Sequence, residues 1–465
     1  MLYLCTSLPQ LPLESRCPPT EDPVAIAERS GARRWLVACN DACRGAGIHI
    51  GMDATTALAL YPSLRLIERS SPHEREAIKG LAAWAEQFSH WVCFDPERLL
   101  LWIEIKSGLR YFGGVGEIRS RVEHGLAQLG HVGFIGIGPT LEAAALLSQV
   151  PEAPMIERQT QLAASLDKLP LAAMALADDL LEAFTDLGLS SVGQVLVLPR
   201  DATARRYGPE LLDYLDRLTG RLRDPRKPYR APDKYRRRFE LLGSVEVVEG
   251  LLFPLRRMFV ELQGYLIARD TAVAQVQIEL LHDEGEPTLL RIRTTRPLRD
   301  AVRLFALVKE RLERTTLGRP VEEIVLYVER FEALGDTQLE LIDSGRRKDQ
   351  GWHELLDRLR ARLGDSAVQE LGLQDQHLPE QAWCTVGESD GGTEPIPERP
   401  MWVLQPRRIR TLPKRFGKPE RIEAGWWNGE DKRRDYHTVA AADGSQLWVY
   451  HDADSDSWYL HGLWG

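Results

Sequence analysis

The sequence predicts an α+β protein of several domains, and three observations support this prediction. The chain has 465 residues, which exceeds the size at which one hydrophobic core stops growing. Strand-like and helix-like patterns alternate over residues 1–165, whereas residues 166–230 hold only short helical patterns joined by tight turns. Two amphipathic helices and alternating strands then return over residues 239–331. We therefore expect two α+β regions separated by a helical one.

The N-terminal region predicts strands and helices in alternation. Its first segment, YLCTSL, is a short apolar strand that ends at Pro9, and a Gly-rich bend follows the second strand. We expect strands at residues 3–8, 35–39, 99–105 and 132–137, and helices from Asp53 and at residues 74–88, 118–129 and 139–150. The run at 99–105 is too continuously apolar for a half-exposed strand, so we expect both of its faces to be covered.

One acidic side chain, Glu104, lies inside this apolar run. A carboxylate in a buried strand is costly unless it is paired, bound to a metal or placed at the strand end. Lys106 and Gly108 follow closely, so Glu104 is expected near the end of the strand. The alternative is one half of a metal site, which requires a second acid elsewhere in the chain.

The composition is that of a soluble globular protein, with 43% hydrophobic and 27% charged residues. No apolar stretch reaches the roughly 18 residues that span a bilayer, and the first residues lack the features of a signal peptide. The six cysteines show no disulfide framework, and we interpret Cys39 and Cys43 as buried thiols rather than zinc ligands. We expect a cytoplasmic protein without a membrane segment.

The positive charge is concentrated in two stretches, although the net charge is −9. Residues 205–238 hold twelve Lys/Arg against five Asp/Glu, and residues 407–434 hold ten against four. Local positive potential in an acidic chain indicates contact with a polyanion. We expect DNA contacts at Arg205, Arg206, Arg236, Arg237 and Arg238. The alternative is that both stretches are solvated linkers without a partner.

The helical region contains a pattern that binds DNA backbones. In LGLSSVGQV, Gly188 lies between two helices, and Ser190 or Ser191 begins the second helix. This is the helix-hairpin-helix pattern, in which backbone N–H groups at a helix start hold a phosphate. We expect Gly188 and Ser191 to contribute to DNA binding.

The C-terminal half continues with a small α+β module, a polar joint and an aromatic tail. We expect helices at 248–269 and 298–315 packed on strands at 272–281, 288–295 and 322–331. A helix, WHELLDRLRARLG, and a Gly/Glu/Pro-rich linker, GESDGGTEPIPERP, precede the tail.

This order of modules over residues 1–332 resembles the Y-family translesion DNA polymerases. RYFGG at 110–114, together with GWWNGEDKRRDY and LHGLWG in the tail, is similar to the ImuB-type branch, the polymerase-like accessory proteins of bacterial mutagenesis cassettes. The resemblance implies the following division: a palm at 1–165 with a fingers insertion at about 15–75, a helix-hairpin-helix thumb at 166–232, a little finger at 236–332, a clamp-binding joint with a helix and linker at 333–397, and a partner-binding region at 398–465.

The resemblance also implies which residues stand at the metal positions. The first family strand, of the form hIDMDxFFAxVE, reads YLCTSLPQLPLE here, which places Cys5 and Ser7 at its two aspartates and matches only Glu14. The adjacent Asp-Glu of SIDExxLD falls on Leu99 and Leu100, and Glu104 matches the final, structural Asp. Mg²⁺ requires hard oxygen ligands, so we expect no catalysis, no metal and no cofactor.

The family's nucleotide contacts are also altered. Its Tyr-x-x-Arg aligns with DACR, which keeps Arg44 but places Asp41 at the tyrosine, and its lysine falls on Leu141. Asp95 and Glu97 remain as alternative, displaced metal ligands. The first family hairpin, Gly-hydrophobic-Gly, reads Met174-Ala175-Leu176, so we expect only the second hairpin to bind phosphate.

A short peptide in the joint resembles the bacterial sliding-clamp-binding motif. In QLELI, the residues Gln338, Leu339, Leu341 and Ile342 match a QLxLF-like pattern in which Ile342 replaces Phe. Leu341 and Ile342 would fill an apolar pocket while Gln338 bonds at its rim. The alternative is an ordinary amphipathic segment that packs on the following helix.

The tail holds six of the chain's twelve tryptophans in its last 64 residues. Aromatic and arginine side chains are typical of interface hot spots, so we expect partner contacts at Trp426, Trp427, Arg433, Arg434 and Tyr436. By resemblance, the partners are a RecA-like cassette protein and an error-prone replicative-type polymerase. The alternative is that these aromatics form the core of a small β module.

Two main hypotheses for the function follow. The first is a non-catalytic scaffold of the SOS response to DNA damage, which supports mutagenesis and translesion synthesis by binding damaged or primed DNA, the sliding clamp and the cassette partners. The second is an active lesion-bypass polymerase with rearranged metal ligands. A third hypothesis is a general DNA-structure-binding protein without clamp contact. It differs from the first because a mutation of Gln338 would not affect its function.

Overall fold

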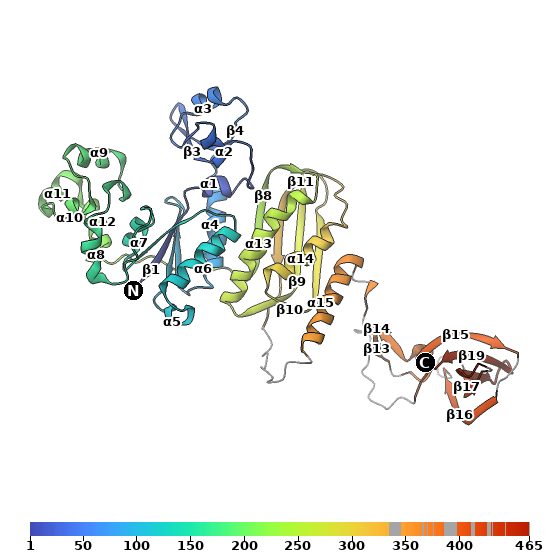
Figure 1. Ribbon diagram of the computed structural model, residues 1–465. Helices are drawn as coiled ribbons and strands as arrows, with labels where there is room; N and C mark the ends of the chain where they lie inside the picture. Colours follow the sequence, from blue (N-terminus) through green and yellow to red (C-terminus); the bar gives the residue numbers. More distant parts are fainter. Residues whose placement is uncertain are drawn as a thin grey trace. The chain divides into compact units, whose positions relative to one another are not determined.

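The computed structural model describes residues 1–333, 346–364, 367–369, 371–374, 376–385, 398–410, 414–425, 429, 431–441 and 443–464 (Figure 1). The chain forms two compact units, Met1–Arg362 and Leu363–Gly465. No helix in the described ranges is both long enough and apolar enough to cross a membrane. The chain contains several modules, of which two combine helices with an antiparallel sheet and one is helical, so the predicted α+β, multidomain fold class is confirmed.

The first sheet has four strands and begins with the N-terminal segment of the chain. Its order is β5-β6-β1-β7 and all of its neighbours are antiparallel. Its strands are β1 (Tyr3–Ser7), β5 (Val92–Asp95), β6 (Leu100–Glu104) and β7 (Phe134–Gly138). The predicted strands at 3–8 and 99–105 are present, and the one predicted at 132–137 begins two residues later.

Helices cover both faces of the first sheet, as the apolar run at 99–105 predicts. Helices α4 (Ser71–Ala85) and α6 (Val115–Gln128) pack on the face that carries Leu101 and Ile103. Helix α7 (Leu141–Leu147) packs on the opposite face with Leu100 and Trp102. It lies so close to β7 that a Cβ on Gly136 would stand 2.2 Å from the main-chain oxygen of Ala144.

The insertion after the short helix α1 (Leu11–Glu14) contains a sheet that the sequence pattern predicts only in part. Strand β2 pairs antiparallel with β3 and parallel with β4. The elements are β2 (Val24–Ser30), β3 (Arg33–Cys39), α2 (Asp41–Gly45), α3 (Ala54–Leu60) and β4 (Arg65–Glu68). The predicted helix start at Asp53 is confirmed, because its side chain accepts a hydrogen bond from the Thr55 N–H at 2.9 Å. Strands β2 and β4 were missed because their apolar runs are short.

The helical region packs around its own core, in which Phe184 and Leu218 are fully buried. Its helices are α8 (Gln159–Leu166), α9 (Asp178–Asp186), α10 (Val192–Leu196), α11 (Arg200–Tyr207) and α12 (Pro209–Thr219). The predicted change to short helices after residue 165 is therefore confirmed.

The second sheet has the main order β10-β9-β11-β8, and β12 (Glu332–Ala333) also pairs with β9. Its main strands are β8 (Tyr235–Val245), β9 (Thr271–His282), β10 (Thr288–Leu298) and β11 (Val321–Val328). Helices α13 (Glu249–Ala268) and α14 (Ala301–Leu312) pack on one face and bury a common apolar core (Figure 1). Both helices and the three predicted strands are present, but β8 occupies part of the stretch interpreted as a basic linker. Helix α15 (Arg346–Leu363) joins this module through Asp357, which accepts a hydrogen bond from the Thr295 N–H at 2.7 Å.

The segment 220–234, which connects α12 to β8, is packed against the first sheet. The Tyr229 N–H donates to the Val92 carbonyl at 2.7 Å, and the Arg226 side chain is held by ion pairs. Helix α13 in turn packs on α4, where a Cβ on Gly264 would lie 2.6 Å from the Trp84 ring. The interpretation of 205–238 as a solvated linker is therefore wrong for much of its length.

The C-terminal unit consists mainly of a five-stranded antiparallel sheet of order β15-β19-β18-β17-β16. Its strands are β15 (Trp402–Ile409), β16 (Lys414–Ala424), β17 (Lys432–Ala440), β18 (Gln446–Asp452) and β19 (Ser457–Leu463). The hairpin of β13 (Leu371–Leu373) and β14 (Trp383–Thr385) precedes it. The rings of Tyr436 and Trp448 stack at 4.1 Å in its core.

Candidate functional site: the predicted metal positions and a basic sheet face

The four residues at the predicted metal positions lie close together in the first sheet. Cys5 and Ser7 are on β1, and Ser7 pairs directly with Leu100 on β6. Leu99 precedes β6 with a φ of 52°, a left-handed conformation that is uncommon for a leucine. The fold thus brings these positions together as the resemblance implies.

The side chains at these positions are poor ligands for a hard cation. Burial raises the pKa of the Cys5 thiol far above its ordinary value, so the thiol stays neutral. The Ser7 hydroxyl accepts a hydrogen bond from the Gln149 amide at 2.8 Å. Among the described residues, no group of three or more His, Cys, Asp or Glu side chains is arranged to hold a metal ion. Two leucines, a thiol and a bonded hydroxyl do not fit Mg²⁺.

An ion-pair network lies beside these positions, where it involves Glu142 of α7. Both nitrogens of the Arg98 fork donate to the Glu142 carboxylate at 3.0 Å, and Arg226 donates to it at 2.7 Å. The Arg226 guanidinium stands 4.2 Å from the centre of the Trp102 ring, which lies in the same cluster as Cys5. Arg226 also pairs with Asp224 at 3.0 Å and lies 3.8 Å from Asp95. The acids next to the predicted metal positions are therefore engaged in ion pairs with arginines.

The remaining acids of this region have structural partners. Glu104 ends β6 and accepts hydrogen bonds from the Lys106 N–H at 3.1 Å and the Ser107 hydroxyl at 2.8 Å. This is the strand-end role that the sequence favours. Asp95 accepts from the N–H groups of Glu97 and Arg98 in the turn between β5 and β6.

The altered nucleotide contacts are explained locally. Arg44 pairs with Asp41 on the surface, which partly neutralises its charge. Leu141 is buried, and its carbonyl accepts a hydrogen bond from the Trp102 indole at 2.9 Å. Neither position offers a free cation for a triphosphate.

The predicted phosphate site of the helix-hairpin-helix is largely occupied by the protein itself. Gly188 has a φ of 77° and joins the two helices as expected. The N–H groups of Ser190 and Ser191 donate to the Gln194 side chain, and Gln194 N–H donates to the Ser191 hydroxyl. This capping box satisfies the amides that a phosphate would use.

A row of polar side chains crosses the outer face of the second sheet. Strand register places Arg236 beside Tyr327, Tyr327 beside Gln277, and Gln277 beside Arg291. Arg236 and Arg291 are exposed, as is Arg293 two residues further along β10. The row presents cations and an aromatic ring on one side of a sheet, a combination that contacts phosphates and bases.

The triplet Arg236–Arg238 is divided by the alternation of β8. Arg237 lies on the inner face with Tyr235 and Phe239, where it forms a buried ion pair with Glu261 at 2.6 Å. Its predicted role in DNA contact is therefore wrong. Arg238 is exposed but pairs with Glu323, so Arg236 is the free cation of the three.

Arg205 and Arg206 lie in the last turn of α11 and are both exposed. Their side chains remain candidates for phosphate contact. Arg291, Arg293 and Tyr327 were missed from the sequence, although the alternation Leu290-Arg291-Ile292-Arg293 already places both arginines on the polar face of a strand.

The clamp-like motif at Gln338, Leu339, Leu341 and Ile342 lies outside the described residues, as do Trp426 and Trp427 of the tail. Two other tail predictions are corrected. Arg434 and Tyr436 are buried in the C-terminal sheet, where Arg434 pairs with Glu380 at 2.9 Å and the Tyr436 hydroxyl lies 2.9 Å from His461. These two side chains hold the sheet together and are not available to a partner. Arg433 is exposed and pairs with Asp431.

Comparison with known proteins shows what the N-terminal region and the whole chain are similar to. Residues 14–149 match the model of the impB/mucB/samB family. The chain is also 26% identical over 458 residues to Protein ImuB from two strains of Caulobacter vibrioides, and the match covers 90% of this chain and 100% of each relative. These matches confirm the resemblance to the ImuB-type branch.

Solved structures of Y-family polymerases are similar at low identity. DinB from Sulfolobus solfataricus is 14% identical, with 71% of this chain and 98% of that chain covered and a TM-score of 0.39. The insertion ternary complex of Dbh DNA polymerase is 13% identical, with 72% and 100% covered and a TM-score of 0.40.

Proposed function

We propose that this chain is a non-catalytic, polymerase-like scaffold that supports mutagenesis and translesion synthesis after DNA damage in the cytoplasm. The observation that carries the proposal is the contrast between two surfaces. The positions at which the resemblance places metal ligands hold Cys5, Ser7 and two leucines, beside the ion pairs of Arg98 and Arg226 with Glu142. The outer face of the second sheet keeps its cations exposed for a nucleic acid.

In this proposal the first sheet with its insertion corresponds to the palm and fingers, the helical region to the thumb and the second sheet to the little finger. Damaged or primed DNA binds along the second sheet. Segments after residue 333 recruit the sliding clamp, a RecA-like protein and an error-prone replicative-type polymerase. The similarity to Protein ImuB over most of the chain supports this reading.

Primer extension tests the absence of catalysis. The purified chain with Mg²⁺ or Mn²⁺ and all four nucleotides should extend a primer no further than a protein-free control, because the described residues hold no group of three or more His, Cys, Asp or Glu side chains that could bind the catalytic metal ions. Incorporation that persists after contaminating polymerases are removed, and that is lost in the variant Asp95→Asn with Glu97→Gln, would establish the alternative of displaced ligands.

DNA binding should depend on the arginine row of the second sheet. Replacing Arg236, Arg291 and Arg293 by glutamine should weaken binding to primed DNA uniformly across sequences. Each lost phosphate contact should reduce the slope of log affinity against log salt by about 0.9. The matched control replaces Arg119 and Arg121, which are ion-paired on α6. Equal losses in both variants, measured by fluorescence anisotropy over a salt series, would move the DNA surface elsewhere.

The clamp motif makes a separate prediction. Changing Leu341 and Ile342 to alanine should weaken binding to a bacterial sliding clamp at least tenfold, since each buried aliphatic side chain contributes roughly 1.5–3 kcal/mol. The control is Leu289→Ala, which truncates an exposed leucine on β10. Surface plasmon resonance that gives the same clamp affinity for both variants contradicts the assignment and favours a DNA-binding protein without clamp contact.

A further inference from the structure

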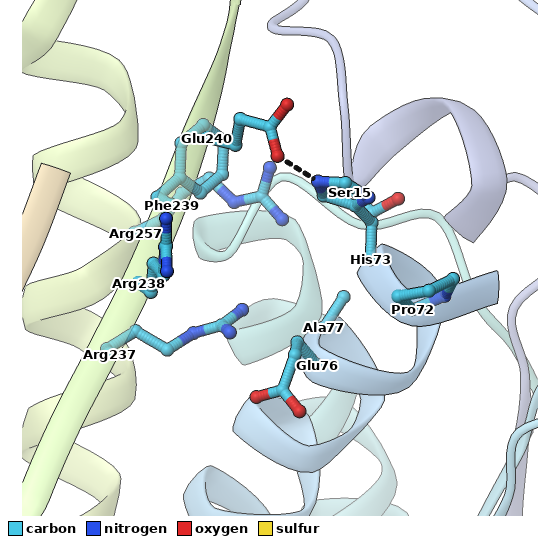
Figure 2. A pocket seen from close by; sticks show the side chains of 10 residues that line it. All are labelled: Ser15, Pro72, His73, Glu76, Ala77, Arg237, Arg238, Phe239, Glu240 and Arg257. Carbon is cyan, nitrogen blue, oxygen red and sulfur yellow. Dashed lines mark hydrogen bonds and ion pairs between the residues drawn. The ribbon is translucent and has the colours of Figure 1, made fainter. Parts of the chain in front are cut away.

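A cavity of about 130 Å³ lies between α4 and Ser15 on one side and β8 with α13 on the other (Figure 2). Three arginines, Arg237, Arg238 and Arg257, line it together with Ser15. Figure 2 shows the Arg237 side chain reaching from β8 toward α4. The cavity adjoins β8, which is an edge strand of the second sheet and also carries Arg236 of the exposed row.

Most charges around this cavity have a direct partner of opposite sign. Arg237 pairs with Glu261 at 2.6 Å, and Arg238 pairs with Glu323. The carboxylates that line the cavity are also paired. Glu76 bonds to Lys79 at 2.6 Å, and Glu240 bonds to the His73 ring at 2.6 Å.

Arg257 is the exception among these cations. It is only 4% exposed, and its fork donates to neutral acceptors, the Glu14 main-chain oxygen at 2.8 Å and His131 Nε2 at 2.7 Å. Its Nε–H has no hydrogen-bond partner. The rings of Phe239 and Phe253 stand 5.7 and 5.6 Å from the guanidinium and give partial compensation only.

A buried guanidinium without a directly bonded carboxylate is energetically unfavourable. Burial accordingly lowers the pKa of Arg257 to about 10; the nearby Glu261 carboxylate opposes this shift, and the neighbouring Arg237 adds to it. An anion bound in the cavity would compensate the buried positive charge of Arg257. The unpartnered Nε–H of Arg257 can donate to a tetrahedral oxyanion. The Ser15 hydroxyl, which now donates to the Pro12 carbonyl at 3.3 Å, can rotate to become a second donor to such a group.

We propose that this cavity binds one phosphate group, with Arg257 as its principal cation and Ser15 as a second donor. The group comes either from free phosphate or from the backbone of DNA that lies across the second sheet and past the edge of β8. The proposal goes beyond the scaffold function, because it assigns a discrete anion site on the inner side of the sheet.

The first experiment uses inorganic phosphate as the probe. Titration of the full chain, followed by ³¹P line broadening and by isothermal calorimetry in chloride buffer, should give saturable binding to one site. Arg257→Gln should weaken this binding at least tenfold. Arg256→Gln, which removes the exposed neighbouring cation on the same helix, should leave it unchanged.

A second variant covers the case in which Arg257→Gln fails to fold. Ser15→Asp places a carboxylate inside the cavity as an internal substitute for the anion. It should abolish phosphate binding and raise the melting temperature in phosphate-free buffer. Phosphate binding that survives in Ser15→Asp would overturn the proposal. It would also be overturned if the wild type shows no saturable binding of phosphate and the Ser15→Asp variant binds DNA with the same affinity as the wild type.

Competition identifies the source of the phosphate group. If inorganic phosphate displaces a primed oligonucleotide from the wild type at constant ionic strength, and Ser15→Asp removes this competition, the site holds a DNA phosphate. If phosphate binds with the same affinity in the presence and absence of saturating oligonucleotide, the site holds free phosphate. Both outcomes support the site, and they do not depend on whether the chain extends primers.

Discussion

Replacing Glu142 by alanine should lower the free energy of unfolding by about 3 kcal/mol, the lower end of the range for a broken buried pair, because Arg98 loses its carboxylate while Arg226 keeps Asp224 at 3.0 Å. Glu142 is 4% exposed, and both Arg98 and Arg226 bond to it directly. Arg226 lies in the segment 220–234, so the change also removes one of the contacts that hold this segment on the first sheet.

Urea denaturation followed by circular dichroism measures this effect. The matched control is Glu97→Ala, which removes an exposed carboxylate whose nearest cation, Arg75, is 3.5 Å away. A surface pair of this kind contributes between 0 and 1 kcal/mol or so, about the level at which many ion pairs give no measurable effect. If the Glu142 and Glu97 variants unfold at the same urea concentration, the arginine network does not stabilise the fold.

Replacing Glu14 or His131 by glutamine should change how the free energy of unfolding varies with pH. The two replacements should change its slope in opposite directions. His131 Nε2 accepts from Arg257, so its Nδ1–H donates to the Glu14 carboxylate at 2.9 Å. Burial raises the pKa of Glu14 to about 7 and lowers the pKa of His131 well below its ordinary value of 6.5. Near pH 5.5 the folded protein therefore carries one proton at this pair, on Glu14. The unfolded chain also carries one, on the histidine, so the two contributions nearly cancel in the wild type.

Each variant removes one of these two protonation sites. In Glu14→Gln the folded state binds no proton here, whereas the unfolded state takes one up below pH 6.5, so stability falls as the pH is lowered. In His131→Gln the folded state keeps a proton on Glu14 below pH 7, which the unfolded chain releases above about pH 4.5, so stability rises as the pH is lowered. Each slope, taken relative to the wild type, should approach 1.4 kcal/mol per pH unit between pH 6.5 and 5. Parallel curves for the wild type and both variants would show that the pair titrates as it does in the unfolded chain.

The sequence predicts much of the first sheet because both faces of its strands are apolar. Leu101 and Ile103 face α4 and α6, while Leu100 and Trp102 face α7, and this produces the uninterrupted run that marks a covered strand. The same reasoning places Glu104 at the strand end. The two missed strands of the insertion have short apolar runs, which give no comparable signal.

The candidate site is less predictable because it depends on pairings between distant residues. The sequence did not predict strand β8 because its three successive arginines were interpreted as part of a basic linker. Tyr235 and Phe239 mark its inner face, and the alternation of the strand places Arg237 on the same face. Partners such as Glu142 and Arg226 are 84 residues apart, and no local pattern relates them. A high density of aromatic residues is found both in interfaces and in cores, so the sequence alone does not tell them apart. Only the structure shows that Tyr436 is buried.

The position of β1 in the first sheet has a consequence for how the chain is made. This strand begins at the third residue, yet its two neighbours are β6 at residues 100–104 and β7 at residues 134–138. At roughly 5–20 residues per second, a ribosome needs on the order of 5–20 seconds to supply the first of these partners. During that interval the apolar segment Leu2–Leu8 has left the ribosome without its sheet, while helices such as α4 can already form from local contacts. We therefore expect the first strand to need protection from aggregation, by chaperones or by transient burial against α4, until β6 and β7 have been made.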